Sequence, residues 1–181
     1  MPTIEIVLTE KQREYVEEIA AVTGKKMQPP IELSPERWCF RSLRQVAQNA
    51  NAIWHNAERD GKAEVLDPTK KAGSQVVITY KFSELEHWMK DYIYVPPKVA
   101  KGEESIRLVF PQALFDALRH AALLDALSMD ARGEKRNWKD FNGWIDDLLD
   151  RRIVEGKIWA DSVAWEEEET EAFKAKPGKV K

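Results

Sequence analysis

The longest stretch of the chain without proline or glycine lies between Pro35 and Gly61, and it limits the folds that the chain can adopt. Ser34 is a hydroxyl N-cap, and Pro35 occupies the first helical turn, where its missing N–H is not needed. Neither proline nor glycine occurs at positions 36–60, and Gly61 then provides a C-terminal stop. We therefore expect one long helix over residues 35–60, with which the other elements must pack.

One side of this predicted helix is apolar. Its members recur at spacings of four and three residues, and the small side chains among them permit a close approach by another helix. This seam consists of Cys39, Leu43, Val46, Ala50, Ile53 and Ala57. The pattern predicts that the helix packs along its length against the core or against a second copy of the chain.

The opposite side carries guanidinium, amide and imidazole groups at the same spacing. Its members are Arg37, Arg41, Arg44, Gln48, Asn51 and His55. No Asp or Glu lies between residues 37 and 57, so this stretch carries a charge of +3; because the whole chain carries −3, the remainder carries −6. Arginine, glutamine and asparagine are side chains that meet phosphates and base edges, so this side predicts contact with nucleic acid.

Two other interpretations fit the arginine side. It can be the solvated face of an amphipathic helix, paired with acids such as Asp146, Asp147 and Asp150, or it can bind an acidic protein. Three phosphate contacts would give a salt-dependence slope of only about −3, so useful affinity for nucleic acid would require dimerisation or a larger assembly.

Two regions of the chain share one order of elements. Residues 3–60 are predicted to form a strand, a helix begun by a Thr9–Gln12 capping box, a connector and the long helix. Residues 104–156 are predicted to form a strand, a helix opened by Pro111, a charged turn and a helix that ends at Gly156. This order predicts an α+β fold, predominantly helical, built from two strand-helix-helix units joined by a small strand-containing linker segment.

The pattern divides the chain into four segments. They are 1–61, the first unit with its basic face; 62–103, the linker; 104–156, the second unit; and 157–181, a tail that is acidic and then basic. Within the linker we expect a loop at 62–74, a strand at 75–82, a short helix begun by Ser83 and a further candidate strand at 92–95.

The repeated order resembles the ribbon-helix-helix family of DNA-binding proteins. The similarity is clearest in IEIVLTEKQREYVEEIAAVTG at 4–24 and in IRLVFPQALFDALRHAALL at 106–124. In that family two strands pair into an antiparallel ribbon, and its outward side chains enter the major groove. The resemblance implies that the outward side chains here are Thr3, Glu5, Val7, Ser105, Arg107 and Val109. Arg107 is the base-reading candidate among them.

Three of the seven tryptophans are candidates for binding rather than for core packing. Trp54 lies beside His55 and one turn from Asn51, which makes it a candidate platform for an unpaired base. Trp159 and Trp165 precede the acidic run EEEETE, and tryptophan is enriched at the centres of interfaces. We expect these two residues to bind a partner.

Catalytic and metal-binding motifs are missing from the sequence. The single cysteine, Cys39, cannot form an internal disulfide, and His55, His87 and His120 are too scattered for a metal cluster. The lysines in GKK at 24–26 lack the upstream glycine and the Ser/Thr of a phosphate-binding loop. We therefore expect no cofactor, no metal and no enzymatic activity.

The composition predicts a soluble, cytoplasmic protein with no membrane contact. A charged fraction of 33% leaves no run of about 18 apolar residues, and MPTIEIVLTE lacks the pattern of a signal peptide.

The expected function is non-enzymatic nucleic-acid binding, as a regulator or accessory factor. The alternative is a protein-interaction subunit or inhibitor within a larger nucleoprotein complex of phage, plasmid or CRISPR type, which docks through the long helix or the tryptophan-bearing acidic tail. Either role is compatible with a homodimer, and the sequence leaves open whether the nucleic acid is DNA or RNA.

Overall fold

A computed structural model of the chain describes residues 1–66, 77–100 and 104–174. The fold is α+β and predominantly helical, as the sequence predicts. In chain order the elements are β1 (Thr3–Val7), α1 (Glu10–Lys26), α2 (Pro35–Asp60), β2 (Lys62–Leu66), β3 (Val77–Lys81), α3 (Phe82–Trp88), the 3-10 turn η1 (Met89–Asp91), β4 (Ser105–Val109), α4 (Gln112–Ala131) and α5 (Phe141–Lys174).

Local hydrogen bonds set the ends of the first two helices as the sequence predicts. At the start of α1, the Gln12 backbone N–H donates to Thr9 Oγ1 over 3.2 Å, and the Thr9 backbone N–H donates to Gln12 Oε1 over 2.8 Å. At the start of α2, the Arg37 backbone N–H donates to Ser34 Oγ over 3.3 Å. Gly61 ends α2 with φ of 69°, the left-handed region that glycine adopts without a Cβ clash.

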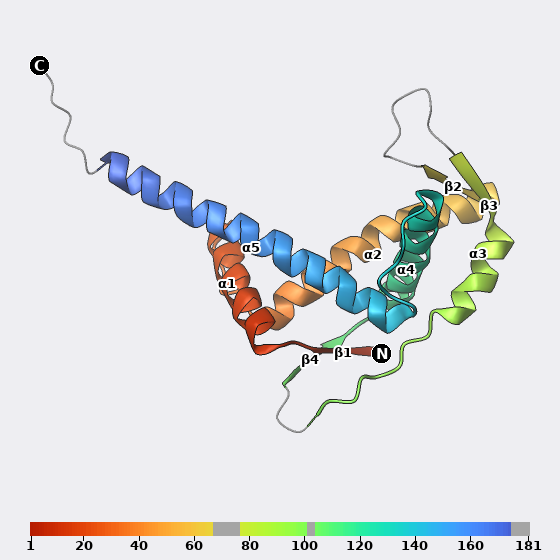
Figure 1. Cartoon of the computed structure of the whole chain (residues 1–181), viewed down its shortest axis with the longest axis horizontal. Coiled ribbons are helices and arrows are strands. Elements are labelled where there is room, and N and C mark those ends of the chain that lie inside the picture. The colour runs from red at the N-terminus through yellow and green to blue at the C-terminus, as the bar shows by residue number, and fades with distance from the viewer. Residues whose placement is uncertain (67–76, 101–103, 175–181) are drawn as a thin grey trace, which may run out of the picture.

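β1 and β4 pair into an antiparallel ribbon although they come from opposite parts of the chain (Figure 1). Glu5 lies opposite Arg107 in this register. Strand side chains alternate between two faces, and the inner face here is buried. It consists of Ile4, Ile6, Ile106 and Leu108. The six side chains predicted to face outward are all half-buried or exposed, so the predicted faces of both strands are confirmed.

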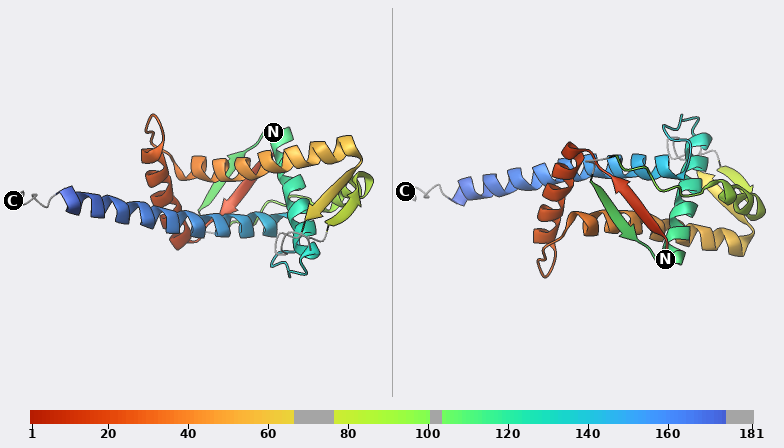
Figure 2. Two further views of the ribbon diagram at one scale, coloured as in Figure 1. Left: turned by 90° about the horizontal axis from the view of Figure 1, so that it is seen from above. Right: turned by 90° about the horizontal axis from the view of Figure 1, so that it is seen from below.

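The helices of the two predicted units pack crosswise. α1 packs on α5, and α4 packs on α2, so the first helix of each unit lies against the second helix of the other. Seen from below in Figure 2, α2 and α5 run along two sides, α1 and α4 cross near the two ends, and the ribbon lies across this frame. One buried cluster takes side chains from both units, among them Ile4, Ile19, Leu43, Ile106, Leu118 and Trp144.

The linker holds a second two-stranded sheet. A strand is confirmed within the predicted range 75–82: it is β3, Val77–Lys81, and it pairs antiparallel with β2. Phe82 already belongs to α3, whose N-cap is Lys81, so the predicted helix start at Ser83 is wrong. β2 falls in the segment 62–74 that the sequence assigned to a loop, and this assignment is wrong for residues 62–66 because pairing with β3 decides their conformation. The remainder of the predicted loop lies outside the described residues.

Residues 92–95 are not the strand that their composition suggests. Side chains hold this segment in place of a ladder: the Glu5 backbone N–H donates to the Tyr94 hydroxyl over 2.7 Å, and the Val95 N–H donates to Asn142 Oδ1 over 3.0 Å. Arg119 donates to the Tyr92 carbonyl oxygen over 2.6 Å. The segment therefore covers the free edge of β1 without joining the sheet.

α5 does not end at Gly156, so that prediction is wrong; the helix continues to Lys174 and includes the acidic run (Figure 1). Gly156 lies where α5 crosses α1: a Cβ added to it would lie 3.0 Å from Ile19 Cδ1. The glycine thus permits a close approach of two helices. The basic end predicted for the tail falls at 175–181, outside the described residues.

We predict that Gly156→Leu destabilises the fold. Overpacking a tight core contact costs typically about 1–3 kcal/mol, which exceeds the roughly 1 kcal/mol that leucine gains over glycine in helix propensity. Urea unfolding measures the change. In an Ile19→Ala background the clash is relieved, so the same substitution should be neutral or stabilising there; an equal loss in both backgrounds would contradict the crossing at Gly156.

Candidate nucleic-acid interface

The buried side of α2 includes Trp38 in addition to the predicted seam, and it replaces two members of that seam with their neighbours. Ala47 and Trp54 are buried, whereas Val46 is half-buried and Ile53 is 51% exposed. A spacing of three and four residues defines a helix face only approximately, and packing against α4 selects which residues are buried. The inward line on α2 consists of Trp38, Cys39, Leu43, Ala47, Ala50, Trp54 and Ala57.

The opposite side of α2 is open, as the arginine hypothesis requires. All its predicted members are exposed except the half-buried Asn51. Among the described residues, Arg37, Arg41 and Arg44 form no ion pair; the Arg41 guanidinium donates only to the Met27 thioether, a weak acceptor, over 3.6 Å. The three guanidinium groups therefore remain available to an anion.

The acids that the sequence proposed as a cover for these arginines lie elsewhere. Asp147 pairs with Arg151 within α5, with 3.1 Å between carboxylate oxygen and guanidinium nitrogen. Asp150 accepts a hydrogen bond from Gln12 of α1, and none of the described contacts joins Asp146 to α2. These three acids therefore do not pair with the arginines of α2, contrary to the interpretation of a paired solvent face.

A groove of about 330 Å³ brings Arg107 to the arginines of α2. Arg37, Arg41 and Arg107 line it together with one carboxylate, that of Glu36. Its remaining lining is apolar and comes from the 27–34 connector, α2 and β4: Ile31, Leu33, Phe40, Leu108 and Val109. We call this the ribbon-edge groove. It has an apolar floor and a rim with a net charge of +2.

A second groove, of about 520 Å³, continues along α2. Arg41 lines both grooves, so they meet at its side chain. We call the second one the helix groove, and its lining is mostly polar: Thr23, Trp38, Arg41, Ser42, Arg44, Gln45 and Gln48. The sequence identified Arg44 and Gln48 here but missed Gln45, because a helical spacing pattern does not show that a groove widens the contact face.

The outward face of the ribbon is close to electrically neutral at its centre. Arg107 lies 3.6 Å from Glu5 Oε1, and the Ser105 hydroxyl donates to the same carboxylate over 2.6 Å. Glu5 is only 18% exposed, whereas the Arg107 side chain is 70% exposed. The guanidinium group is therefore presented to solvent while the carboxylate is held against the strands.

Trp54 is not the exposed platform that the sequence suggested. It is 7% exposed, and its ring stacks on His120 of α4 with 3.8 Å between centroids and 4° between planes. It packs there because the inward line of α2 passes through it. His55 is exposed, and its Nδ1 lies 3.4 Å from a carboxylate oxygen of Glu58. The C-terminal end of the predicted contact face therefore has a negative charge beside it.

Trp159 and Trp165 lie on α5 and are 40% and 61% exposed. They are remote from the arginine groups in sequence, and no described contact joins them to α2. Trp165 shares one side of α5 with Val154 and Ile158, which are 58% and 64% exposed. The two predicted sets of binding residues therefore belong to different surfaces.

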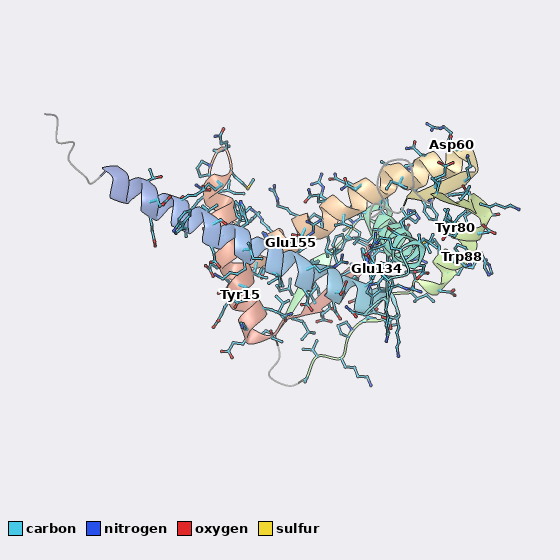
Figure 3. All side chains as sticks on the ribbon, turned by 45° about the horizontal axis from the view of Figure 1, so that its top comes forward. Tyr15, Asp60, Tyr80, Trp88, Glu134 and Glu155 are labelled. Atoms are coloured by element: carbon cyan, nitrogen blue, oxygen red, sulfur yellow. The ribbon has the colours of Figure 1, made fainter. Side chains whose placement is uncertain are left out.

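The structure also contains a cavity of about 440 Å³ that the sequence did not reveal. Tyr80 and Trp88 form one wall, with ring centroids 5.7 Å apart in an edge contact, and Figure 3 shows them together beside β3 and α3. The remainder of the lining includes apolar side chains of α4 and charged groups of both signs: Asp91, Asp130, Arg136, Lys139 and Asp140. Arg136 pairs with Asp130 over 3.4 Å, so the cavity carries a mixed ion network.

The described residues contain no group of three or more His, Cys, Asp or Glu side chains that could hold a metal ion. Burial raises the pKa of the Cys39 thiol to about 12, which keeps it protonated and unreactive at neutral pH. In the same part of the chain, no helix is both long enough and apolar enough to cross a membrane.

Comparison of the chain with models of protein families, with curated proteins and with solved structures gave no match.

We predict that His120 makes the fold sensitive to acid. Burial is the main reason that the pKa of His120 is lowered to about 4. The positive charges of Arg119 and His55 also lower this pKa, whereas the negative charges of Asp116 and Glu58 raise it by less than burial lowers it. The folded protein therefore binds fewer protons than the unfolded chain between about pH 6.5 and 4. The free energy of unfolding should fall by up to about 3 kcal/mol from this group as the pH drops through that window.

His120→Phe keeps an aromatic ring against Trp54 and removes the titration. Urea unfolding between pH 7 and pH 4 should therefore show a stability difference, wild type minus variant, that declines as the pH falls. A difference that stays constant over this range would show that His120 does not titrate with a lowered pKa.

Proposed function

We propose that this protein binds nucleic acid without catalysing a reaction, and that it holds the phosphate backbone on Arg37, Arg41, Arg44 and Arg107. The observation that carries the proposal is the ribbon-edge groove, where an arginine of β4 meets two arginines of α2. Burying or crowding like charges is unfavourable without a counter-ion, so a cluster of open guanidinium groups favours a polyanionic ligand. Arginine is also the side chain best matched to phosphate geometry.

The amide side chains of the helix groove support nucleic acid as the polyanion. Gln45 and Gln48 lie beside Arg44 in that groove, where they offer neutral donors and acceptors next to a cation. Amides of this kind make hydrogen bonds to base edges and sugars, whereas guanidinium groups bind the backbone. Gln48, Asn51 and His55 extend the polar side of α2 beyond Arg44.

We further propose that the chain is a single-chain relative of the ribbon-helix-helix family. The intramolecular pairing of β1 with β4 and the crosswise packing of α1 on α5 and α4 on α2 support this relationship. The contact surface is proposed to differ from that of the family. Because Glu5 neutralises the centre of the ribbon, we place the nucleic acid at the β4 edge and along α2 instead.

A second candidate function is supported by the apolar stripe of α5, which consists of Val154, Ile158 and Trp165. At 100° per residue these three side chains lie within about 40° of one another on the helix surface. Each is more than half exposed, and aligned exposed apolar side chains mark interaction sites. We propose that two copies of the chain associate through this stripe.

An antiparallel pairing of two α5 helices has complementary charge. With Val154 opposite the partner's Trp165, Arg151 would lie near the partner's Glu168, and the same contact would recur by symmetry. Such a dimer would double the number of phosphate contacts, which a site with few arginines requires for useful affinity.

For the first candidate, replacing Arg37, Arg41 and Arg44 together with alanine should strongly weaken the binding of nucleic acid at low salt. Four phosphate contacts predict a slope of log K against log salt of about −3 to −4 for the wild-type protein, and the residual binding of the triple variant should show a slope of only about −1. Fluorescence anisotropy of labelled oligonucleotides over a salt series measures both quantities.

A matched control removes the same charge elsewhere. Lys90, Lys98 and Lys135 are exposed and line neither groove. Replacing these three with alanine should lower affinity only slightly. If both triple variants bound alike, or if the wild-type protein bound no nucleic acid, the proposed site would be wrong.

For the second candidate, sedimentation of the wild-type protein should show a mass that rises with concentration. Ile158→Glu with Trp165→Glu should keep the chain monomeric, because the charges would be buried without partners. Ile93→Glu with Val95→Glu alters side chains of equal exposure outside α5 and should leave association unchanged. A wild-type protein that is monomeric at every concentration would exclude this dimer.

A further inference from the structure

The ribbon-edge groove combines two properties that a phosphate site alone does not need. Its rim carries the guanidinium groups of Arg37, Arg41 and Arg107, but its floor is apolar. Ile31 is 38% exposed and Val109 is 50% exposed there. Large apolar side chains of this kind are expensive to leave against water, so the floor favours a ligand with an apolar face.

The floor is built rigidly enough to receive a flat group. Leu33 and Leu108 are 6% and 4% exposed, so most of each side chain is fixed in the core. The Phe40 ring stacks on Phe110, with centroids 4.9 Å apart and planes at 24°, which fixes its orientation beside the groove. A ligand that enters would therefore meet a preformed surface rather than mobile side chains.

We infer that the ribbon-edge groove takes an unpaired base, so that the protein prefers single-stranded nucleic acid to a duplex. This inference rests on the proposed function, because the arginines must bind the adjoining phosphates. The base lies against Phe40, Ile31 and Val109, while its phosphates contact the rim. The strand then passes Arg41 into the helix groove, where Arg44 and the glutamine side chains meet the next nucleotides.

A duplex fits this surface less well. Its bases are stacked and paired, so it offers the groove mainly phosphates and leaves the apolar floor against water. An unpaired base has an exposed π-face, and stacking or apolar contact of one base with a protein strengthens binding about tenfold or more. The open rim accepts a backbone of either sugar, so single-stranded DNA and single-stranded RNA are both tested.

An acidic peptide with an apolar side chain would also match the ribbon-edge groove, but it matches the helix groove poorly. Gln45 and Gln48 are neutral and lie beyond the arginine cluster. They suit base edges, which carry donors and acceptors in pairs, better than a run of carboxylates. The observations therefore favour a nucleic-acid strand, and the peptide becomes an outcome of the experiment.

The experiment compares four labelled probes on the full chain by fluorescence anisotropy. They are a short single-stranded oligodeoxynucleotide of mixed sequence, its RNA equivalent, the corresponding duplex, and an abasic strand of the same length and charge. At least one of the single strands with bases should bind about tenfold more tightly than both the duplex and the abasic strand.

Ile31→Ser with Val109→Ser then replaces the two most exposed aliphatic side chains of the floor without removing charge. Both residues are partly exposed, so the variant should fold, which circular dichroism checks. It should lose about tenfold in affinity for the single strand and almost nothing for the abasic strand. Ile53→Ser with Val99→Ser is the matched control, since these side chains are 51% and 38% exposed but line neither groove.

The outcomes separate the two proposals. Equal binding of single strand and duplex, or an unchanged preference in the floor variant, would overturn the unpaired-base inference and leave the arginine site intact. Binding of no probe at all would defeat the proposed function as well. Displacement of the single strand by a glutamate- and phenylalanine-rich peptide at lower concentration than by unlabelled strand would overturn the inference in favour of a protein partner.

Discussion

The pairing of β1 with β4 is the contact on which the rest of the structure depends. Glu5 and Arg107 are opposite each other in the ribbon, and closing a loop of roughly a hundred residues costs conformational entropy that grows with its length. The inner face offsets this cost, since burying each of Ile4, Ile6, Ile106 and Leu108 contributes about 1.5–3 kcal/mol. Because the two strands are antiparallel, the helices that follow them, α1 and α4, start at opposite ends of the ribbon, and they pack on α5 and α2.

The same pairing creates the candidate site. Arg107 is separated from Arg37 and Arg41 by the long helix, the linker and the second sheet, yet the ribbon places β4 beside the first turns of α2. Meanwhile, the carboxylate of Glu5 is held between Ser105 and Arg107 and is largely covered. Positive charge is consequently presented at one edge of the ribbon rather than across its face.

α5 contains a glycine at its crossing with α1 and extends well beyond that crossing. Gly156 lets α5 cross close above Ile19, and the helix continues beyond this crossing to Lys174. Its outer part is joined to α1 through ion pairs of Lys26 with Glu167 and of Lys157 with Glu18, at 2.9 and 3.1 Å. These contacts are exposed and contribute little to stability, so the apolar stripe of α5 stays open to a partner.

Several features were predictable from the sequence because they depend on near neighbours. The caps at Thr9 and Ser34, the stop at Gly61 and the alternation in both strands are local, and all are found in the structure. The exchange of Val46 and Ile53 for Ala47 and Trp54 in the buried line was not predictable. A spacing pattern defines a helix face only to within a residue, and packing against α4 selects which residue is buried.

The sequence by itself therefore determined the caps of α1 and α2, the alternation of β1 and β4 and the acid-free arginine side of α2. Only the tertiary structure decided that the arginines stay unpaired among the described residues, that Arg107 joins them over an apolar floor, and that Trp54 is buried against His120. Gly156, too, became a crossing point only through contact with Ile19. The reason is physical: helix and strand signals act over a few residues, whereas charge pairing, grooves and burial depend on contacts between segments far apart in the chain.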